Sequence, residues 1–263
     1  LTKRLEAVVD WINNHIDDYN IKFVAVLGDI TDTAERSEFL KAKEILDRLN
    51  DLNVPYFPIV GNHDICPYIQ QPGQEWGLLE RLIWGKQGSI SREYFMEVFN
   101  SEFFNKQFNY LQVQPDFKFE KYVDYSFKYK GIKFIFLDSA GNTYASEVVP
   151  YFAGAWPTGN ISDETEQFLR DVLEYEESVI IFSHHPLYYN KLKGTFNWYK
   201  VWNIIQQKNV NIIANFAGHT HRNKLVVRFH SCPECSLLCL FSDYGCIETE
   251  GVIDESSNVV RIV

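Results

Sequence analysis

The sequence predicts an α/β fold, because short apolar runs alternate with segments of helical periodicity and several of these runs end in glycine and polar residues. The first 60 residues follow the order helix, strand, helix, strand, which is typical of a right-handed parallel α/β unit. The chain has 263 residues, of which 46% are hydrophobic and 23% charged. A chain of this length and composition can bury one large core, so residues 1–263 are expected to form a single domain.

The first half of the chain supplies two helices and two strands. The apolar residues over 1–18 recur at helical spacing and predict an amphipathic helix lying on a sheet: Leu1, Leu5, Val8, Ile12 and Ile16. A strand is expected over 21–27, a helix over 34–49 and a short strand over 56–60. Asp32 and Glu35 resemble a capping box at the start of the second helix, so Asp32 is expected to be a helix cap rather than a metal ligand.

An aromatic-rich insertion follows, predicted over about 66–121, whose rings are expected to pack mostly among themselves. Its aromatic residues include Trp76, Trp84, Tyr94, Phe95, Phe99, Phe103, Phe104 and Phe108. A hairpin, 122–129 with 132–137, turns at Lys130-Gly131. The remaining expected elements are a helix over 162–173, a strand over 178–182, a helix over 198–208, a strand over 211–216 and antiparallel strands over 224–263.

Charge and hydropathy exclude two classes of protein. The formal net charge is -10 and there is no run of basic residues, which argues against a non-specific DNA binder. No apolar stretch approaches the roughly 20 residues of a membrane helix. Cys232 and Cys235 have the spacing of metal ligands, but Cys239 and Cys246 lie too close for a zinc ribbon, and a turn or local disulfide is favoured.

Four predicted strands end in residues that can bind a metal: Asp29, Asn62, His184, and His219 with His221. The carboxyl ends of parallel strands lie along one edge of a sheet, so these residues are expected to meet in one crevice. Carboxylate, carboxamide and imidazole groups without thiolate suit Mn, Fe, Zn or a similar divalent ion.

The motifs GDITD, GNHD, FSHHP and GHTH, in this order, resemble those of the calcineurin-like metallophosphoesterase superfamily, which includes purple acid phosphatases and cyclic nucleotide phosphodiesterases. The resemblance extends from Ile21 to His221. It implies a four-layered α/β sandwich of two mixed β-sheets flanked by helices. It also implies a centre of two divalent metal ions that hydrolyses phosphomonoesters or phosphodiesters.

The residue match implies a role for each candidate. Asp29 resembles the carboxylate that bridges both ions, His63 the catalytic histidine, and Asp64 the residue that orients it. Asn62, His184 and His219 match ligands of the second ion, and His221 matches a ligand of the first. The family's first motif, Asp-x-His, is absent. We therefore expect the natural protein to carry an upstream strand with this motif and the 263 residues to be a truncated chain.

The chemistry of these residues is consistent with such roles. Two neighbouring ions can generate a hydroxide and hold the phosphoryl oxygens during in-line displacement. The Asn62 carbonyl would bind without adding negative charge. His63 can protonate the leaving oxygen, with Asp64 fixing its tautomer. Ser183 lacks the Gly-x-Ser-x-Gly elbow of a serine hydrolase, and His185 is expected either to contact substrate or to make a supporting hydrogen bond.

The leading hypothesis is a metal-dependent phosphohydrolase acting on a small phosphorylated substrate, chosen by residues 66–121 and the loop 144–156. The alternative is a non-catalytic phosphate-binding or scaffold protein that retains one metal site. A nuclease acting on long nucleic acid is disfavoured by the acidic charge. The sequence leaves open the choice between monoester and diester, the metals, the oligomeric state and the compartment.

Overall fold

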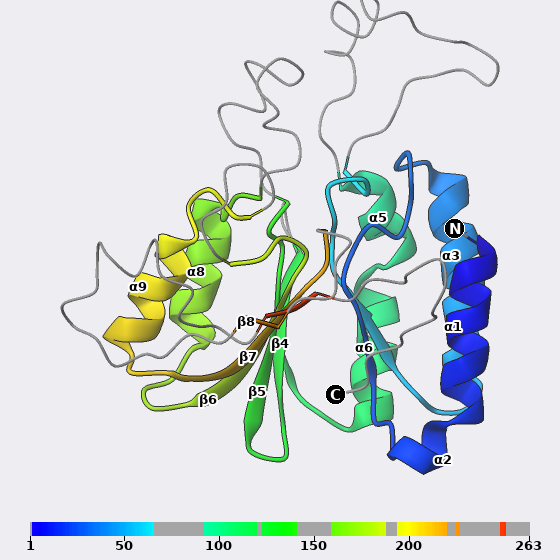
Figure 1. Ribbon diagram of the computed structural model, residues 1–263, viewed down its shortest axis with the longest axis horizontal. Coiled ribbons are helices and arrows are strands. Elements are labelled where there is room, and N and C mark those ends of the chain that lie inside the picture. The colour runs from blue at the N-terminus through cyan, green and yellow to red at the C-terminus, as the bar shows by residue number, and fades with distance from the viewer. Residues whose placement is uncertain are drawn as a thin grey trace, which may run out of the picture.

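The computed structural model describes residues 2–65, 92–119, 123–140, 159–187, 194–219, 225–226 and 248–250. The strands within these ranges form two sheets. One is the parallel pair β1 (Val24–Val26) and β2 (Tyr56–Pro58), and the other has seven strands in the order β3-β4-β5-β6-β7-β9-β8. Figure 1 shows the two sheets side by side, with helices on the outer side of each. This arrangement is the four-layered α/β sandwich that the sequence predicted.

The larger sheet is mixed. Its members β3, β4 and β5 pair antiparallel, β5, β6, β7 and β9 pair parallel, and β8 pairs antiparallel with β9. Their bounds are β3 Pro115–Phe119, β4 Val123–Tyr129, β5 Ile132–Leu137, β6 Ser178–Ser183, β7 Asn211–Ala217, β8 Leu225–Val226 and β9 Glu248–Glu250. The helices of the described residues are α1 Thr2–Asn14, α2 Ile16–Tyr19, α3 Arg36–Asn50, α5 Glu93–Val98, α6 Ser101–Leu111, α8 Asp163–Val172 and α9 Tyr199–Gln207. None of these helices has the length and apolar character to cross a membrane.

The helix predicted over 1–18 is interrupted at His15, between α1 and α2. The backbone N–H of His15 donates to the Ile12 carbonyl at 2.9 Å, while its ring Nδ1 lies 2.7 Å from the Trp11 carbonyl. The side chain therefore takes the carbonyl that the next helical hydrogen bond would use, and the regular ladder stops. Ile12 is buried, as the periodicity predicted, and Leu5, Val8 and Ile16 are partly buried against the core. Val9, which lies outside the predicted stripe, is buried as well.

The prediction that Asp32 caps the second helix is wrong. Glu35 is the N-cap of α3, and it forms a reciprocal capping box with Glu38. The Glu38 carboxylate also accepts from the Thr33 backbone N–H at 3.0 Å and the Thr33 hydroxyl at 2.8 Å. This anchors the loop that follows β1 to the first turn of α3, and the Asp32 side chain points instead toward His63, 3.7 Å from its Nδ1.

Two hydrophobic cores hold the layers together. Between the sheets, Phe57 of β2 lies 4.8 Å from Phe127 of β4 between ring centroids, and the Tyr125 hydroxyl donates to the Pro58 carbonyl at 2.7 Å. The second core lies between the large sheet and α8 and α9. Alternate residues of β5 enter the two cores, Phe134 and Phe136 one and Ile135 and Leu137 the other, because successive side chains of a strand point to opposite faces.

Part of the predicted insertion belongs to the main core. Residues 93–119 form α5, α6 and β3, and five of their rings are buried against the sheets: Phe95, Phe99, Phe103, Phe104 and Phe108. Phe104 and Phe108 are four residues apart, so they share one face of α6. Trp76, Trp84 and the other residues over 66–91 lie outside the described part of the chain.

Candidate metal centre

Four predicted ligands meet where strands of both sheets end. Asp29 follows β1, Asn62 follows β2, His184 follows β6 and His219 follows β7. The Asn62 Oδ1 lies 3.0 Å from His184 Nε2 and 2.9 Å from His219 Nδ1, and His184 Nε2 lies 3.3 Å from Asp29 Oδ2. Segments far apart in the sequence, such as those of Asn62 and His219 at 157 residues, therefore place one nitrogen or oxygen atom each around a common point.

These separations fit a shared divalent ion. Nitrogen and oxygen ligands sit about 2.0 to 2.2 Å from zinc or a similar ion, so adjacent ligands of a tetrahedral or octahedral shell lie about 2.8 to 3.6 Å apart. The three measured distances, 2.9, 3.0 and 3.3 Å, fall inside that range. The donor set, carboxylate, carboxamide and two imidazoles, is suited to Zn, Mn or Fe.

The tautomer of His184 supports the same interpretation. Its Nδ1 lies 2.7 Å from the Leu27 carbonyl oxygen, which can only accept, so Nδ1 carries a hydrogen. The Nε2 atom then faces the oxygen atoms of Asn62 and Asp29, which calls for a cation, either a proton or a metal ion, among these groups. Metal-binding histidines commonly donate their other ring N–H to a carbonyl or carboxylate in this way.

Asp29 is held in a constrained position. Its backbone is in the left-handed region with φ 51°, directly after Gly28 with φ 80°, and its Oδ1 accepts from the His63 backbone N–H at 3.0 Å. Burial alone would raise the pKa of Asp29, but the charge and hydrogen bond of His184 and the His63 N–H bring this pKa down to about 2. Asp29 is thus a carboxylate ready to bind a cation.

Gly61 is needed for this geometry. A Cβ atom at position 61 would lie 2.3 Å from both the backbone nitrogen and Oδ1 of Asp29. The loop that follows β1 and the loop that follows β2 therefore touch backbone to backbone at the site. A side chain at position 61 would push the Asp29 carboxylate away.

His185 is a site residue whose role the sequence did not decide. Its ring centroid lies 4.3 Å from that of His219, and the ligand nitrogens of His184, His185 and His219 lie within 4.8 Å of one another. Burial, together with the charges of His184 and His219, holds the pKa of His185 well below its usual range, so the ring is neutral. Its Nε2 is buried and has no hydrogen-bond partner among the residues that the structure describes. The adjacent histidines of SHHP were the only sequence signal for this cluster.

His63 lies at the edge of the site but is not oriented as predicted. Its Nδ1 lies 3.0 Å from the Asp32 carbonyl oxygen, and its side chain is 39% exposed. The Asp64 carboxylate does not contact the His63 ring. It is fully buried and accepts from the Thr31 N–H, the Thr31 hydroxyl and the Gly61 N–H at 2.9 to 3.0 Å. The expectation that Asp64 fixes the His63 tautomer is therefore wrong in this structure, because Asp64 joins the two metal-site loops instead.

Burial of Asp64, reinforced by the nearby Asp29 charge, raises the pKa of the Asp64 carboxyl to about 6. The other predictions near the site, His221 and the loop 144–156, lie outside the described residues. The same holds for Cys232, Cys235, Cys239 and Cys246.

The sequence matches the family described as calcineurin-like phosphoesterase over residues 2–223. The match covers all four motifs that carry the site. The chain belongs to this family. The family comprises metal-dependent enzymes that hydrolyse phosphoesters, and the clustered histidines of this chain are consistent with metal binding.

Among curated relatives, the chain is 24% identical over 216 residues to the uncharacterized protein YvnB of Bacillus subtilis (strain 168). The aligned region is 81% of this chain but 13% of that protein, so the chain spans a small part of this relative's length.

Among solved structures, GAP50, titled the anchor in the inner membrane complex of Plasmodium, matches with a TM-score of 0.45 and 14% identity, over 94% of this chain and 66% of that one. The phosphopantetheinyl hydrolase PptH from Mycobacterium tuberculosis matches with a TM-score of 0.38 and 15% identity, over 77% of this chain and 74% of that one.

Proposed function

We propose that this protein is a metal-dependent phosphohydrolase that cleaves a phosphomonoester or phosphodiester of a small substrate. The observation that carries the proposal is the convergence of Asp29, Asn62, His184 and His219, with 2.9 to 3.3 Å between their ligand atoms. These four residues would hold one ion. Asp29 and His221 are proposed to contribute to a second.

When bound, a pair of divalent ions would supply an activated water and would neutralise charge on the phosphoryl oxygens. The residues of this chain would set the charge of the site and supply the proton donor. Asp29 is the single carboxylate among the four converging ligands, so these side chains leave a bound centre with net positive charge for an anionic substrate. The Asp32 carbonyl orients the His63 ring through Nδ1, which leaves Nε2 as the atom that exchanges a proton with the leaving oxygen.

The proposal is tested by assaying the purified chain with an aryl phosphomonoester and an aryl phosphodiester after addition of Mn, Zn or Fe. The isosteric variant Asp29→Asn should lose at least about 100-fold in turnover, because it removes the carboxylate of the centre. Metal content, measured by elemental analysis, should fall in the same variant. The matched control is His15→Gln, which changes a histidine between α1 and α2 whose ring lies against the Trp11 carbonyl and not at the site.

Two results would contradict the proposal. Hydrolysis that survives complete removal of metal would show that the ions are not needed. A metal-loaded protein that hydrolyses neither ester would favour the alternative, a scaffold or phosphate-binding protein that retains one metal site.

A further inference from the structure

His185 is a buried residue of the metal centre to which neither the motif match nor the proposed reaction gives a role. It is 1% exposed and directly follows His184, after the end of β6. The centroid of its ring lies 4.3 Å from that of His219, whereas the centroids of His184 and His219 lie 5.2 Å apart. The His185 ring is therefore packed into the centre at least as closely as the rings of two predicted ligands.

The protein occupies the Nδ1 side of the His185 ring. The Oγ atom of Ser139 accepts from the His185 backbone N–H at 2.9 Å and lies 3.4 Å from Nδ1. The backbone of Gly159 also lies against the ring, because a Cβ atom there would be 2.5 Å from Cγ and 2.9 Å from Nδ1 of His185. Nε2 is buried and has no hydrogen-bond partner within the described ranges. It is therefore the ring nitrogen left for another group.

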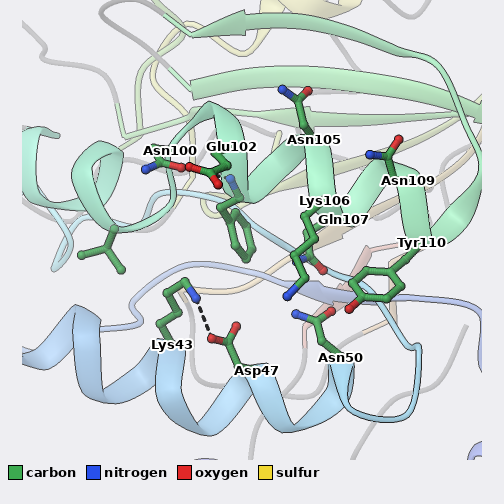
Figure 2. A pocket seen from close by; sticks show the side chains of 12 residues that line it. Lys43, Asp47, Asn50, Asn100, Glu102, Asn105, Lys106, Gln107, Asn109 and Tyr110 are labelled. Carbon is green, nitrogen blue, oxygen red and sulfur yellow. Dashed lines mark hydrogen bonds and ion pairs between the residues drawn. The ribbon is translucent and has the colours of Figure 1, made fainter.

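This unpaired Nε2 does not belong to the cavity of about 700 Å³ that lies between α3 and α6 (Figure 2). The residues that line the cavity come from α3, from the end of α5 and from α6 with its N-cap. They include none of the described residues of the metal centre. Nε2 is thus enclosed in the centre itself. An enclosed nitrogen is out of reach of a substrate molecule, but a metal ion lies between its ligand atoms and needs no open channel of that size.

The separations of the three rings suit a shared ion. One ring nitrogen from each of His184, His185 and His219 lies within 4.8 Å of the other two. Nitrogen ligands sit about 2.0 to 2.1 Å from zinc or a similar ion, so ligands on opposite sides of the ion lie about 4.2 Å apart. A shift of roughly half an ångström would bring all three nitrogens to one ion, and the broad χ2 torsion of histidine allows ring rotations of that size.

We propose that His185 is a further ligand of the metal centre, bound through Nε2, and that it makes the centre favour Zn over Mn. The inference rests on the proposed function for the centre itself, but the ligand set that the family resemblance implies does not include His185. With the hydrogen on Nδ1 donated to Ser139 Oγ, Nε2 presents its lone pair, as is common for metal-binding histidines. Additional imidazole suits Zn, whereas Mn favours carboxylate, carbonyl and water oxygens.

Titration calorimetry of the metal-free full chain with Zn and with Mn tests this proposal. His185→Phe keeps an aromatic ring without nitrogen, so it should weaken Zn binding by more than about 100-fold, the upper end for residues that only support a ligand, and Mn binding by less. His185→Gln places an amide near the position of Nε2, and His185→Asn places one near Nδ1. The Gln variant should therefore bind Zn more tightly than the Asn variant. The visible absorption of the Co-loaded protein, which depends on the ligands of the ion, should change in His185→Phe.

The control is His15→Phe, the same substitution at the histidine between α1 and α2, which should leave Zn affinity and the Co spectrum unchanged. Melting temperatures of the metal-free variants show whether each one folds. Where His185→Phe does not fold, the Gln and Asn variants decide, because both keep a polar side chain.

Two results would overturn this proposal alone. Unchanged Zn affinity in His185→Phe, or Zn affinity in His185→Asn that equals or exceeds that of His185→Gln, would make His185 a residue that only supports His219. A wild-type chain that binds neither Zn nor Mn would contradict the proposed function as well, so the two failures are distinguishable.

Discussion

Single residues in the metal-site loops each make a contact that holds the loops in place. Asp29 and His219 both have left-handed backbone conformations, with φ 51° and 65°, which residues with side chains seldom adopt. Such conformations are common where surrounding structure holds a functional group in place. In this protein Gly28 and Gly61 allow the loops to approach, and the Asp64 carboxylate links them through Thr31 and Gly61.

Among single residues, we expect His63→Ala to lower turnover by roughly 10²- to 10⁴-fold, the usual effect of losing a general acid. Metal content should change little, because the His63 side chain contacts the Asp32 carbonyl and none of the four converging ligands. Steady-state kinetics and elemental analysis of the same preparations measure both effects. Wild-type turnover in the variant would remove His63 from the acid role.

Whole elements are joined by buried polar groups as well as by apolar packing. Asp124 of β4 accepts from the Asp138 backbone N–H at 2.9 Å, at the end of β5, and from the Thr165 hydroxyl of α8 at 2.8 Å. Asp138 in turn forms a buried ion pair with Arg92, at the start of α5. This network therefore joins elements on both sides of the large sheet.

The network predicts a pH effect on stability. Burial, together with the neighbouring Asp138 charge, raises the pKa of Asp124 from 3.8 to about 8. Between these values the folded protein keeps a proton that the unfolded chain releases, so the free energy of unfolding should fall as pH rises, by at most about 1.4 kcal/mol per pH unit. Asp124→Asn mimics the protonated acid and should flatten this dependence.

Urea unfolding between about pH 4.5 and 7.5 measures the slope. The exposed Asp51→Asn variant is the control and should retain the wild-type slope. A slope in Asp124→Asn that matches the wild type would show that Asp124 is ionised in the folded protein at these pH values.

For the whole molecule, the proposed metal centre would link the two sheets. Its four converging ligands come from β1 and β2 of the small sheet and from β6 and β7 of the large one. A group that binds only the folded state stabilises it by an amount set by its concentration relative to its dissociation constant. Metal binding should therefore hold together the aromatic core that lies between the sheets.

We expect the melting temperature to rise when Mn or Zn is added to metal-free protein, and to fall again with a chelator. At a 100-fold excess of free metal over the dissociation constant the gain is about 2.7 kcal/mol. Asp29→Asn should lose most of this gain in differential scanning calorimetry. An equal metal-induced rise in the variant would show that the ions bind elsewhere.

The local pattern of apolar and polar residues was sufficient to predict many of the helices and strands. The apolar runs before Asp29, Asn62, His184 and His219 predicted strands, and these four residues do meet. They meet where strands of two sheets end, however, and not at one edge of a single sheet as the sequence predicted. The helices α3, α8 and α9 and the hairpin of β4 and β5 were predicted to within a few residues. The helices α5 and α6 were missed because their rings were taken as a separate cluster rather than as faces of helices in the main core.

The sequence by itself determined the fold class, the family and the metal-binding residue types, since apolar periodicity and ordered motifs are local properties of the chain. Only the tertiary structure decided which groups orient those residues. The Leu27 carbonyl sets the His184 tautomer, and the Asp32 carbonyl rather than Asp64 orients His63. Backbone carbonyls have no signature in sequence, and contacts between segments 31 to 157 residues apart exist only once the sheets and helices have packed.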